Sequence, residues 1–217
     1  MTTHTQFVAC PLPAPYEPQR ASLPTARKAR AAALDRGHTI KRVTALTAVL
    51  CGGVPATILG VWFPSEPEKW LVGFLVGLVW ANGFEYAYHR FLLHLARSFF
   101  ARRHLLHHGT TGTPAEAEHV NLGGSPVWIA LLFAANGAPV VAADVLFGLG
   151  VAPAMLVAFV AYFVGVEEIH WRIHLGGWLP PGLRSARARH LAHHQRPNAH
   201  FNVFLPLFDW LLGSASG

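Results

Sequence analysis

Long apolar runs alternate with polar, histidine-rich segments along this 217-residue chain. A helix needs about 20 apolar residues to cross a bilayer, and four runs approach or reach that length. They are Val43–Phe63, Trp70–Tyr88, Val127–Leu149 and Ala152–Val166. Short connections join the first run to the second, at Pro64–Lys69, and the third to the fourth, around Gly150. The pattern predicts an all-α integral membrane protein whose four transmembrane helices form two hairpins.

Basic residues are unevenly distributed about these runs. Of the 17 lysines and arginines, only Lys69 lies in a short connection; the rest lie in the N-terminal segment or after the second and fourth runs. Because basic residues near membrane spans stay cytoplasmic, both termini and the segments after these two runs are predicted to be cytoplasmic. The net charge of +6 therefore reflects membrane topology, and we predict no nucleic-acid partner. Charged residues make up only 13% of the chain, about half the usual share in soluble domains.

The N-terminal segment differs from the rest of the chain. Residues 1–42 are predicted to be a disordered, basic tail, and residues 43–217 a single membrane domain. Within the tail, residues 25–36 are basic and alanine-rich, so this stretch is either a helix on anionic lipid or a solvated segment. No apolar signal-peptide segment occurs in the first 40 residues.

Ten of the 14 histidines fall in two windows, residues 89–108 and 170–194. The windows follow the second and fourth runs, so both emerge on the same side of the membrane and form a cytosolic, histidine-rich helical cap. Their spacings are regular: His89 and His94 are five residues apart, His104, His107 and His108 form His-X2-His-His, His170 and His174 form His-X3-His, and His190, His193 and His194 repeat His-X2-His-His.

These spacings favour metal binding. Residues three or four apart share a face of a helix, whereas neighbours such as His107 and His108 point about 100° apart and suit two adjacent ions. On an α-helix, His89 and His94 would be splayed by about 140°. Ten imidazoles exceed the four ligands of a closed zinc site, and without metal many buried nitrogens would be unpaired. We predict a two-metal centre with four or five nitrogens per ion. The other histidines are not predicted ligands: His4, His38, His119 and His200.

Two carboxylates lie close to the histidines in sequence. Glu85 precedes His89 by four residues, and Glu167 precedes His170 by three. A carboxylate that accepts a ligand's second N–H orients the ring, so both are candidates for that role. Direct ligation and an interfacial position are the alternatives.

The four histidine motifs resemble, in order, those of the fatty acid hydroxylase superfamily, which includes sphingolipid fatty acid 2-hydroxylases and sterol desaturases. The resemblance covers residues 80–213 and includes Glu85–His94 and the C-terminal Phe208-Asp-Trp-Leu-Leu-Gly213. It implies two irons at the ten histidines, with O2 as oxidant and hydroxylation of a lipid C–H bond, most simply on a fatty acyl chain. Zinc is a possible occupant of the isolated protein because it binds such ligands more tightly than ferrous iron.

The resemblance also has departures and open alternatives. Phe201 is followed by Asn202 where the family usually has glycine, and three residues separate His170 from His174 where carotenoid hydroxylases usually have four. Carotenoid hydroxylation and lipid desaturation remain alternatives within the superfamily; a non-catalytic metal protein or a metal transporter lies outside it. No cytochrome b5 domain is fused here, so we expect a separate electron donor, either cytochrome b5-like or a ferredoxin with its reductase. The arginine-rich composition suggests a bacterial inner membrane.

Overall fold

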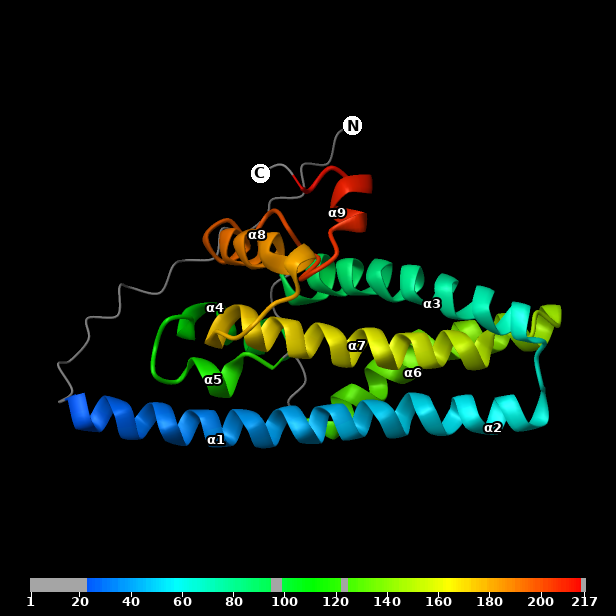
Figure 1. Cartoon of the computed structure of the whole chain (residues 1–217), viewed down its shortest axis with the longest axis horizontal. Coiled ribbons are helices and arrows are strands. Elements are labelled where there is room, and N and C mark those ends of the chain that lie inside the picture. The colour runs from blue at the N-terminus through cyan, green and yellow to red at the C-terminus, as the bar shows by residue number, and fades with distance from the viewer. Residues whose placement is uncertain (1–22, 95–98, 122–124, 216–217) are drawn as a thin grey trace.

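The computed structural model describes residues 23–94, 99–121 and 125–215, and these residues form helices and connecting segments without a strand. Four helical stretches are long and apolar enough to cross a membrane. The first is continuous from α1 (Leu23–Ala48) through the π-helical turn η1 (Val49–Gly53) into α2 (Val54–Trp62). The others are α3 (Pro67–Ala87), which continues into the π-helical segment η2 (Tyr88–Leu93), α6 (Pro126–Phe147) and α7 (Ala152–Leu175). The predicted all-α fold with four spans is confirmed (Figure 1).

The hairpin connections lie together at one end of the bundle (Figure 1). Between α6 and α7 the chain turns through Gly148 and Gly150, whose φ angles of 63° and 70° favour glycine. The side chain of Asp144 accepts the backbone N–H of Val151 at 2.7 Å. Ser65, in the other connection, donates its hydroxyl to the Gly150 carbonyl at 2.6 Å, which ties the two hairpins together.

Close packing of α3 against α7 forms the centre of the bundle. Gly73 and Gly77 face α7, where a Cβ on Gly73 would lie 2.8 Å from the carbonyl oxygen of Val151. Small residues four apart allow helix backbones to approach closely in membranes. Large apolar side chains on the other faces, such as Leu71 and Leu75, are more than half exposed, as expected for surfaces that contact lipid.

Shorter helices form a cap at the opposite end of the bundle from the hairpin connections (Figure 1). They are α4 (Phe99–Thr110), α5 (Glu116–His119), the 3-10 turn η3 (Pro181–Leu183), α8 (Arg184–Gln195) and α9 (Leu207–Leu211). The cap joins the ends of η2 and α7, so it brings together the two histidine windows.

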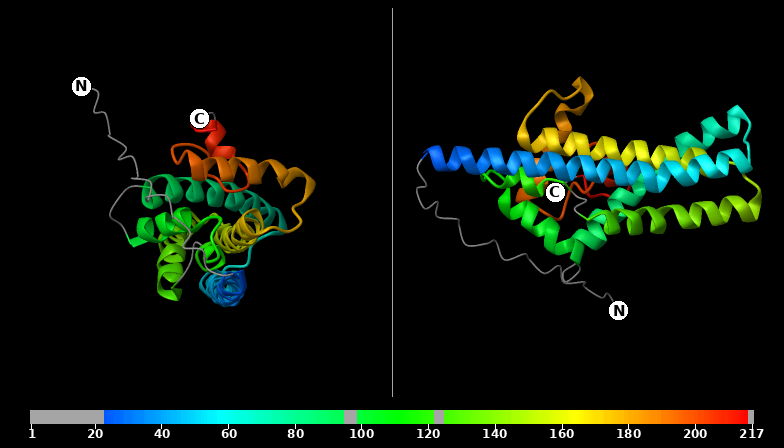
Figure 2. Two further views of the ribbon diagram at one scale, coloured as in Figure 1. Left: turned by 90° about the vertical axis from the view of Figure 1, so that its left-hand side faces the viewer. Right: turned by 90° about the horizontal axis from the view of Figure 1, so that it is seen from below.

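The described part of the predicted disordered tail is helical. Because α1 begins at Leu23, residues 23–42 continue the first span as one rod beside α7 and the cap (Figure 2). Arg36 pairs with Glu118 at 2.8 Å, and Lys41 pairs with Glu168 of α7. Gly37 allows the helix to approach α5, since a Cβ there would lie 2.1 Å from the Ala117 carbonyl oxygen. Residues 23–42 are therefore helical and not disordered. The predicted domain boundary at residue 42 stays a prediction, and the predicted disorder of residues 1–19 lies outside the described residues.

Candidate metal centre

The cap and the adjoining helix ends bring all ten predicted histidines together as two groups. Within each group, the ring nitrogens that could bind a metal all lie within 4.8 Å of one another. Site 1 consists of His89, His94, His104, His108 and His193, and site 2 of His107, His170, His174, His190 and His194. His38, His119 and His200 belong to neither group, and His4 lies outside the described residues.

Adjacent histidines divide between the two sites, as the helical spacing predicts. On α4, His108 belongs to site 1 and its neighbour His107 to site 2. The same division occurs on α8, between His193 and His194. Both sites therefore share the same two helices and adjoin each other, with the rings of His108 and His194 stacked at a centroid distance of 4.1 Å.

The predicted splay of His89 and His94 is wrong. Residues 88–93 form a π-helical segment, and His94 follows as its C-terminal cap. A π-helix bonds residue i to residue i+5, so residues five apart lie one turn above each other. The wider turn therefore brings both rings into site 1, with centroids 5.1 Å apart.

The Nε2 atoms within each site point at one another. In site 1, His104 Nε2 lies 3.1, 3.0 and 2.9 Å from the Nε2 atoms of His89, His94 and His108, respectively. In site 2, His190 Nε2 lies 2.9, 2.9 and 3.1 Å from those of His170, His174 and His194.

One ring nitrogen cannot hydrogen-bond three others at once, because it carries either a single hydrogen or a single lone pair. Two imidazole ligands at right angles on an ion, with metal–nitrogen bonds of about 2.1 Å, would have nitrogens about 3.0 Å apart. The observed distances match that separation, so the residues of each site fit one metal ion.

Burial keeps these imidazoles in the form that binds metal. His104, His107 and His190 are at most 3% exposed, and burial lowers the pKa of each well below the ordinary value for histidine. Burial also lowers the pKa of His94 to about 4 and that of His193 to about 3. All five are therefore neutral at pH 7, as metal binding requires. Neither ring nitrogen of His107 has a hydrogen-bond partner among the described residues, which leaves a buried imidazole for an ion to satisfy.

Four ligand candidates have a partner at their other ring nitrogen. In site 1, His193 Nδ1 donates to the Ala199 carbonyl at 2.7 Å and His89 Nδ1 donates to the Phe201 carbonyl. In site 2, the partners are the Glu116 carboxylate, 2.9 Å from His174 Nδ1, and the Thr111 hydroxyl, 3.1 Å from His194 Nδ1. Such partners fix the ring orientation and tautomer of a metal-binding histidine.

Sequence reasoning missed these partners because none lies at helical spacing from the histidine it contacts. Helical spacing predicts Glu85 instead, and the structure corrects that prediction: the hydrogen bonds of Glu85 among the described residues include none to a histidine. Its carboxylate accepts the Tyr162 hydroxyl at 2.6 Å and, from a C-terminal segment, the Val203 N–H and the Asn202 side-chain amide, both at 2.9 Å. Glu167 is buried on α7, and its role in orienting a histidine stays a prediction.

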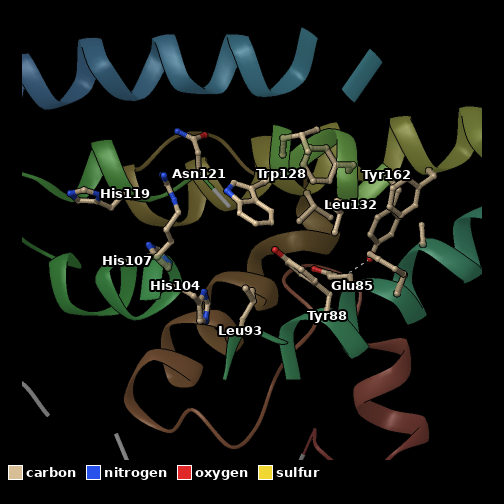
Figure 3. Close-up of a pocket in the computed structure, with 17 residues that line it drawn as sticks. Glu85, Tyr88, Leu93, His104, His107, His119, Asn121, Trp128, Leu132 and Tyr162 are labelled. Atoms are coloured by element: carbon tan, nitrogen blue, oxygen red, sulfur yellow. Dashed lines mark hydrogen bonds between the residues drawn. The ribbon is translucent and has the colours of Figure 1, made fainter. Parts of the chain in front are cut away.

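A mostly apolar pocket adjoins both sites (Figure 3). Its walls come from α3, η2, α6 and α7, and include Phe84, Leu93, Trp128, Ile129, Leu132, Phe159, Phe163 and Val166. His104 of site 1 and His107 of site 2 line one end, near His119 and Asn121, while Glu85 and Tyr162 lie toward the other. Arg103 also lines the pocket. The arrangement can place an apolar chain against both candidate metal sites.

Comparison with known families identifies the family to which the chain belongs. Residues 74–214 match the model of the family described as fatty acid hydroxylase, a range that covers more than half of the chain and all ten histidines. The chain belongs to the fatty acid hydroxylase family. This places it among membrane oxidoreductases of the hydroxylase and desaturase type and confirms the resemblance drawn from the histidine motifs. No curated protein and no solved structure matches the chain.

Proposed function

We propose that this protein hydroxylates a C–H bond of a lipid, using O2 and electrons from a separate carrier. A fatty acyl chain is the leading candidate for the substrate. One observation carries the proposal: two adjoining sites of five histidines each present one member, His104 and His107, to an apolar pocket between the spans. An apolar pocket lined by a few polar groups suits a lipid chain. The substrate would enter this pocket from the bilayer.

Iron is the metal that we propose for both sites. Bound there by the ten imidazoles, it would supply the redox chemistry with O2 that amino-acid side chains lack. Zinc suits the same ligands and binds them more tightly than ferrous iron, so isolated protein can carry zinc without zinc being the working metal.

In this proposal the residues of the chain bind the lipid and orient the histidine ligands. Apolar side chains such as Phe159 and Phe163 would hold the lipid chain and exclude water from the histidine sites. At the end near His107, the Arg103 guanidinium and the buried Asn121 side chain offer a donor and an acceptor for a polar head. Glu116 and the carbonyls of residues 199 and 201 hold three of the imidazoles in place.

A desaturase of the same family is the second candidate, because it would use the same sites to remove two hydrogens. Carotenoid and sterol substrates stay within the proposal as alternatives to an acyl chain. Metal transport is disfavoured because a transport path requires polar groups along the spans, whereas these histidines lie on the cap helices α4 and α8, in η2 or just after it, and at the C-terminal end of α7. We further propose that both termini face the cytoplasm, that the membrane is a bacterial inner membrane and that the electron donor is cytochrome b5-like or a ferredoxin with its reductase.

The test is mass spectrometry of total lipids from a host that expresses the protein with a redox partner under air. We expect one lipid class to gain one oxygen with the wild type. With His107→Ala the product should disappear and the metal content of the purified protein should fall. His38→Ala is the matched control, because His38 packs on Trp171 outside both sites and should retain activity. A loss of two hydrogens would identify a desaturase, and full activity of His107→Ala would contradict the proposed site.

A further inference from the structure

Site 1 depends on a short C-terminal segment that belongs to no helix. The segment is residues 199–203, here called the carbonyl loop, and two of its backbone oxygens accept ring N–H groups of site 1. The Ala199 carbonyl accepts His193 Nδ1 at 2.7 Å, and the Phe201 carbonyl accepts His89 Nδ1. The Phe201 ring also lies against the His89 and His193 rings, each at a centroid distance of 5.8 Å.

A loop outside helices and strands has no regular backbone ladder, so other groups must fix its position. Between the two carbonyls, His200 has a φ of 60°, a left-handed conformation uncommon for residues other than glycine. Its N–H donates to the Ser214 carbonyl at 3.0 Å. The orientation of both carbonyls therefore depends on a turn that contacts elsewhere hold in place.

Asp209 of α9 supplies the strongest of these contacts. Its side chain is fully buried, and its two carboxylate oxygens accept the backbone N–H groups of Phe201 and Asn202, each at 2.9 Å. The Ser214 hydroxyl donates to the same carboxylate at 2.7 Å. A carboxylate with several N–H and O–H donors forms stronger hydrogen bonds than neutral groups do. Asp209 thus fixes the Phe201 peptide whose carbonyl orients His89.

Glu85 holds the other side of the carbonyl loop through the Val203 N–H and the Asn202 amide, each at 2.9 Å. The Asn202 amide also donates to the Asn82 carbonyl at 3.0 Å. By contrast, the orienting partners of site 2 described above, Glu116 and Thr111, come from α5 and from the turn that follows α4. Among the hydrogen bonds of the described residues, those from the carbonyl loop to histidine rings therefore go to site 1.

We propose that Asp209 is a positioning residue for site 1: it holds the carbonyl loop so that the Ala199 and Phe201 carbonyls aim the His193 and His89 imidazoles at one ion. This inference rests on the proposed function in that the sites must bind metal. In Asp209→Asn, the amide nitrogen that replaces one oxygen is a donor, so it cannot accept one of the two backbone N–H groups. Loss of a group that hydrogen-bonds a metal-binding histidine directly costs about 10- to 100-fold in metal affinity. Asp209 acts one contact further out, through the Phe201 and Asn202 N–H groups, so this range is an upper bound for its loss.

Cobalt titration of the full-length, metal-depleted protein in detergent tests the proposal, with the visible absorption of bound Co²⁺ as readout. The wild type should bind two equivalents, and Asp209→Asn should weaken one of the two binding phases, by up to about 10- to 100-fold. Asp144→Asn is the matched control, because Asp144 also accepts a backbone N–H, from Val151 at 2.7 Å, but in the last turn of α6, next to the α6–α7 hairpin connection. It should leave both phases unchanged.

Single-site backgrounds assign the affected phase. In His190→Ala, where site 1 remains, adding Asp209→Asn should weaken the remaining ion, and in His104→Ala, where site 2 remains, it should not. If Asp209→Asn impairs folding, Ser214→Ala, which removes one donor to the same carboxylate, should shift the same phase by a smaller factor. Equal shifts of both phases, or none, would overturn the positioning role. A wild type that binds no cobalt would instead overturn the proposed function.

Discussion

Replacing Gly77 with alanine tests the close packing of α3 against α7, on which the bundle depends. A Cβ at this position would lie 2.8 Å from the Ala158 Cβ and 2.8 Å from the Met155 Cα. Ordinary carbon–carbon contacts are about 3.5 to 4.0 Å, so the two helices must separate by about 0.7 Å or more to accept one methyl group. Because Met155 contributes a backbone atom, rotation of a side chain cannot relieve the contact.

Two opposing contributions set the expected change in the free energy of unfolding. Overpacking of this kind costs about 1–3 kcal/mol, whereas replacing glycine with alanine within a helix gains about 1 kcal/mol. Gly165→Ala, on α7, isolates the second contribution, because a Cβ there meets no atom within 4 Å. We therefore expect the free energy of unfolding of Gly77→Ala to lie about 1–3 kcal/mol below that of Gly165→Ala.

Denaturant titration of both variants in the same detergent, followed by far-UV circular dichroism, measures this difference. The affinity for metal should change little, because Gly77 lies 12 positions before His89, about 18 Å along a helix at 1.5 Å per residue. Equal stability of the two variants, within about 0.5 kcal/mol, would refute the argument that α3 and α7 meet at backbone contact.

Two further predictions follow from the site. Glu116→Gln should weaken metal binding at site 2 by about 10- to 100-fold, because the His174 ring loses its charged acceptor. Cobalt titration in the His104→Ala background measures this, and an unchanged affinity would exclude Glu116 as the residue that orients His174. Burial lowers the pKa of His94 to about 4 and that of His193 to about 3, whereas histidine in an unfolded chain has a pKa of about 6.5. Below pH 6.5 the unfolded chain therefore binds more protons than the folded protein does. The free energy of unfolding of metal-free protein should therefore fall from pH 6.5 toward pH 4, and denaturation curves that coincide at pH 7.5 and 5 would contradict this.

Local spacing predicted the features of the fold that depend on one helix at a time. The apolar runs predicted the four spans, since length and composition decide membrane insertion. The 100° step between neighbours predicted that His107 and His108 would serve different ions, and the structure places them in different groups. In both cases the feature depends on residues within one helix, so it can be predicted from the sequence of that helix alone.

Features that depend on contacts between distant segments could not be predicted in this way. The basic residues of α1 resemble those of a solvated tail, because the acidic partners of Arg36 and Lys41 lie 82 and 127 residues away. The π-helical geometry at His89 and His94 changes the angle per residue without an obvious mark in the sequence. The role of Glu116 could not be predicted from local spacing, because its contact with His174 joins α5 to α7 across 58 residues.

The two sites share the same ligand types but differ in what surrounds them. Each has five imidazoles, yet the orienting partners of site 1 are neutral carbonyls and one partner of site 2 is a carboxylate. A carboxylate that accepts a ring N–H raises the basicity of the histidine more than a carbonyl does, because negative charge stabilises the proton's partial charge at that nitrogen. Two ions bound here would therefore occupy unequal environments. That difference comes from Glu116 and the carbonyl loop, not from the histidine motifs.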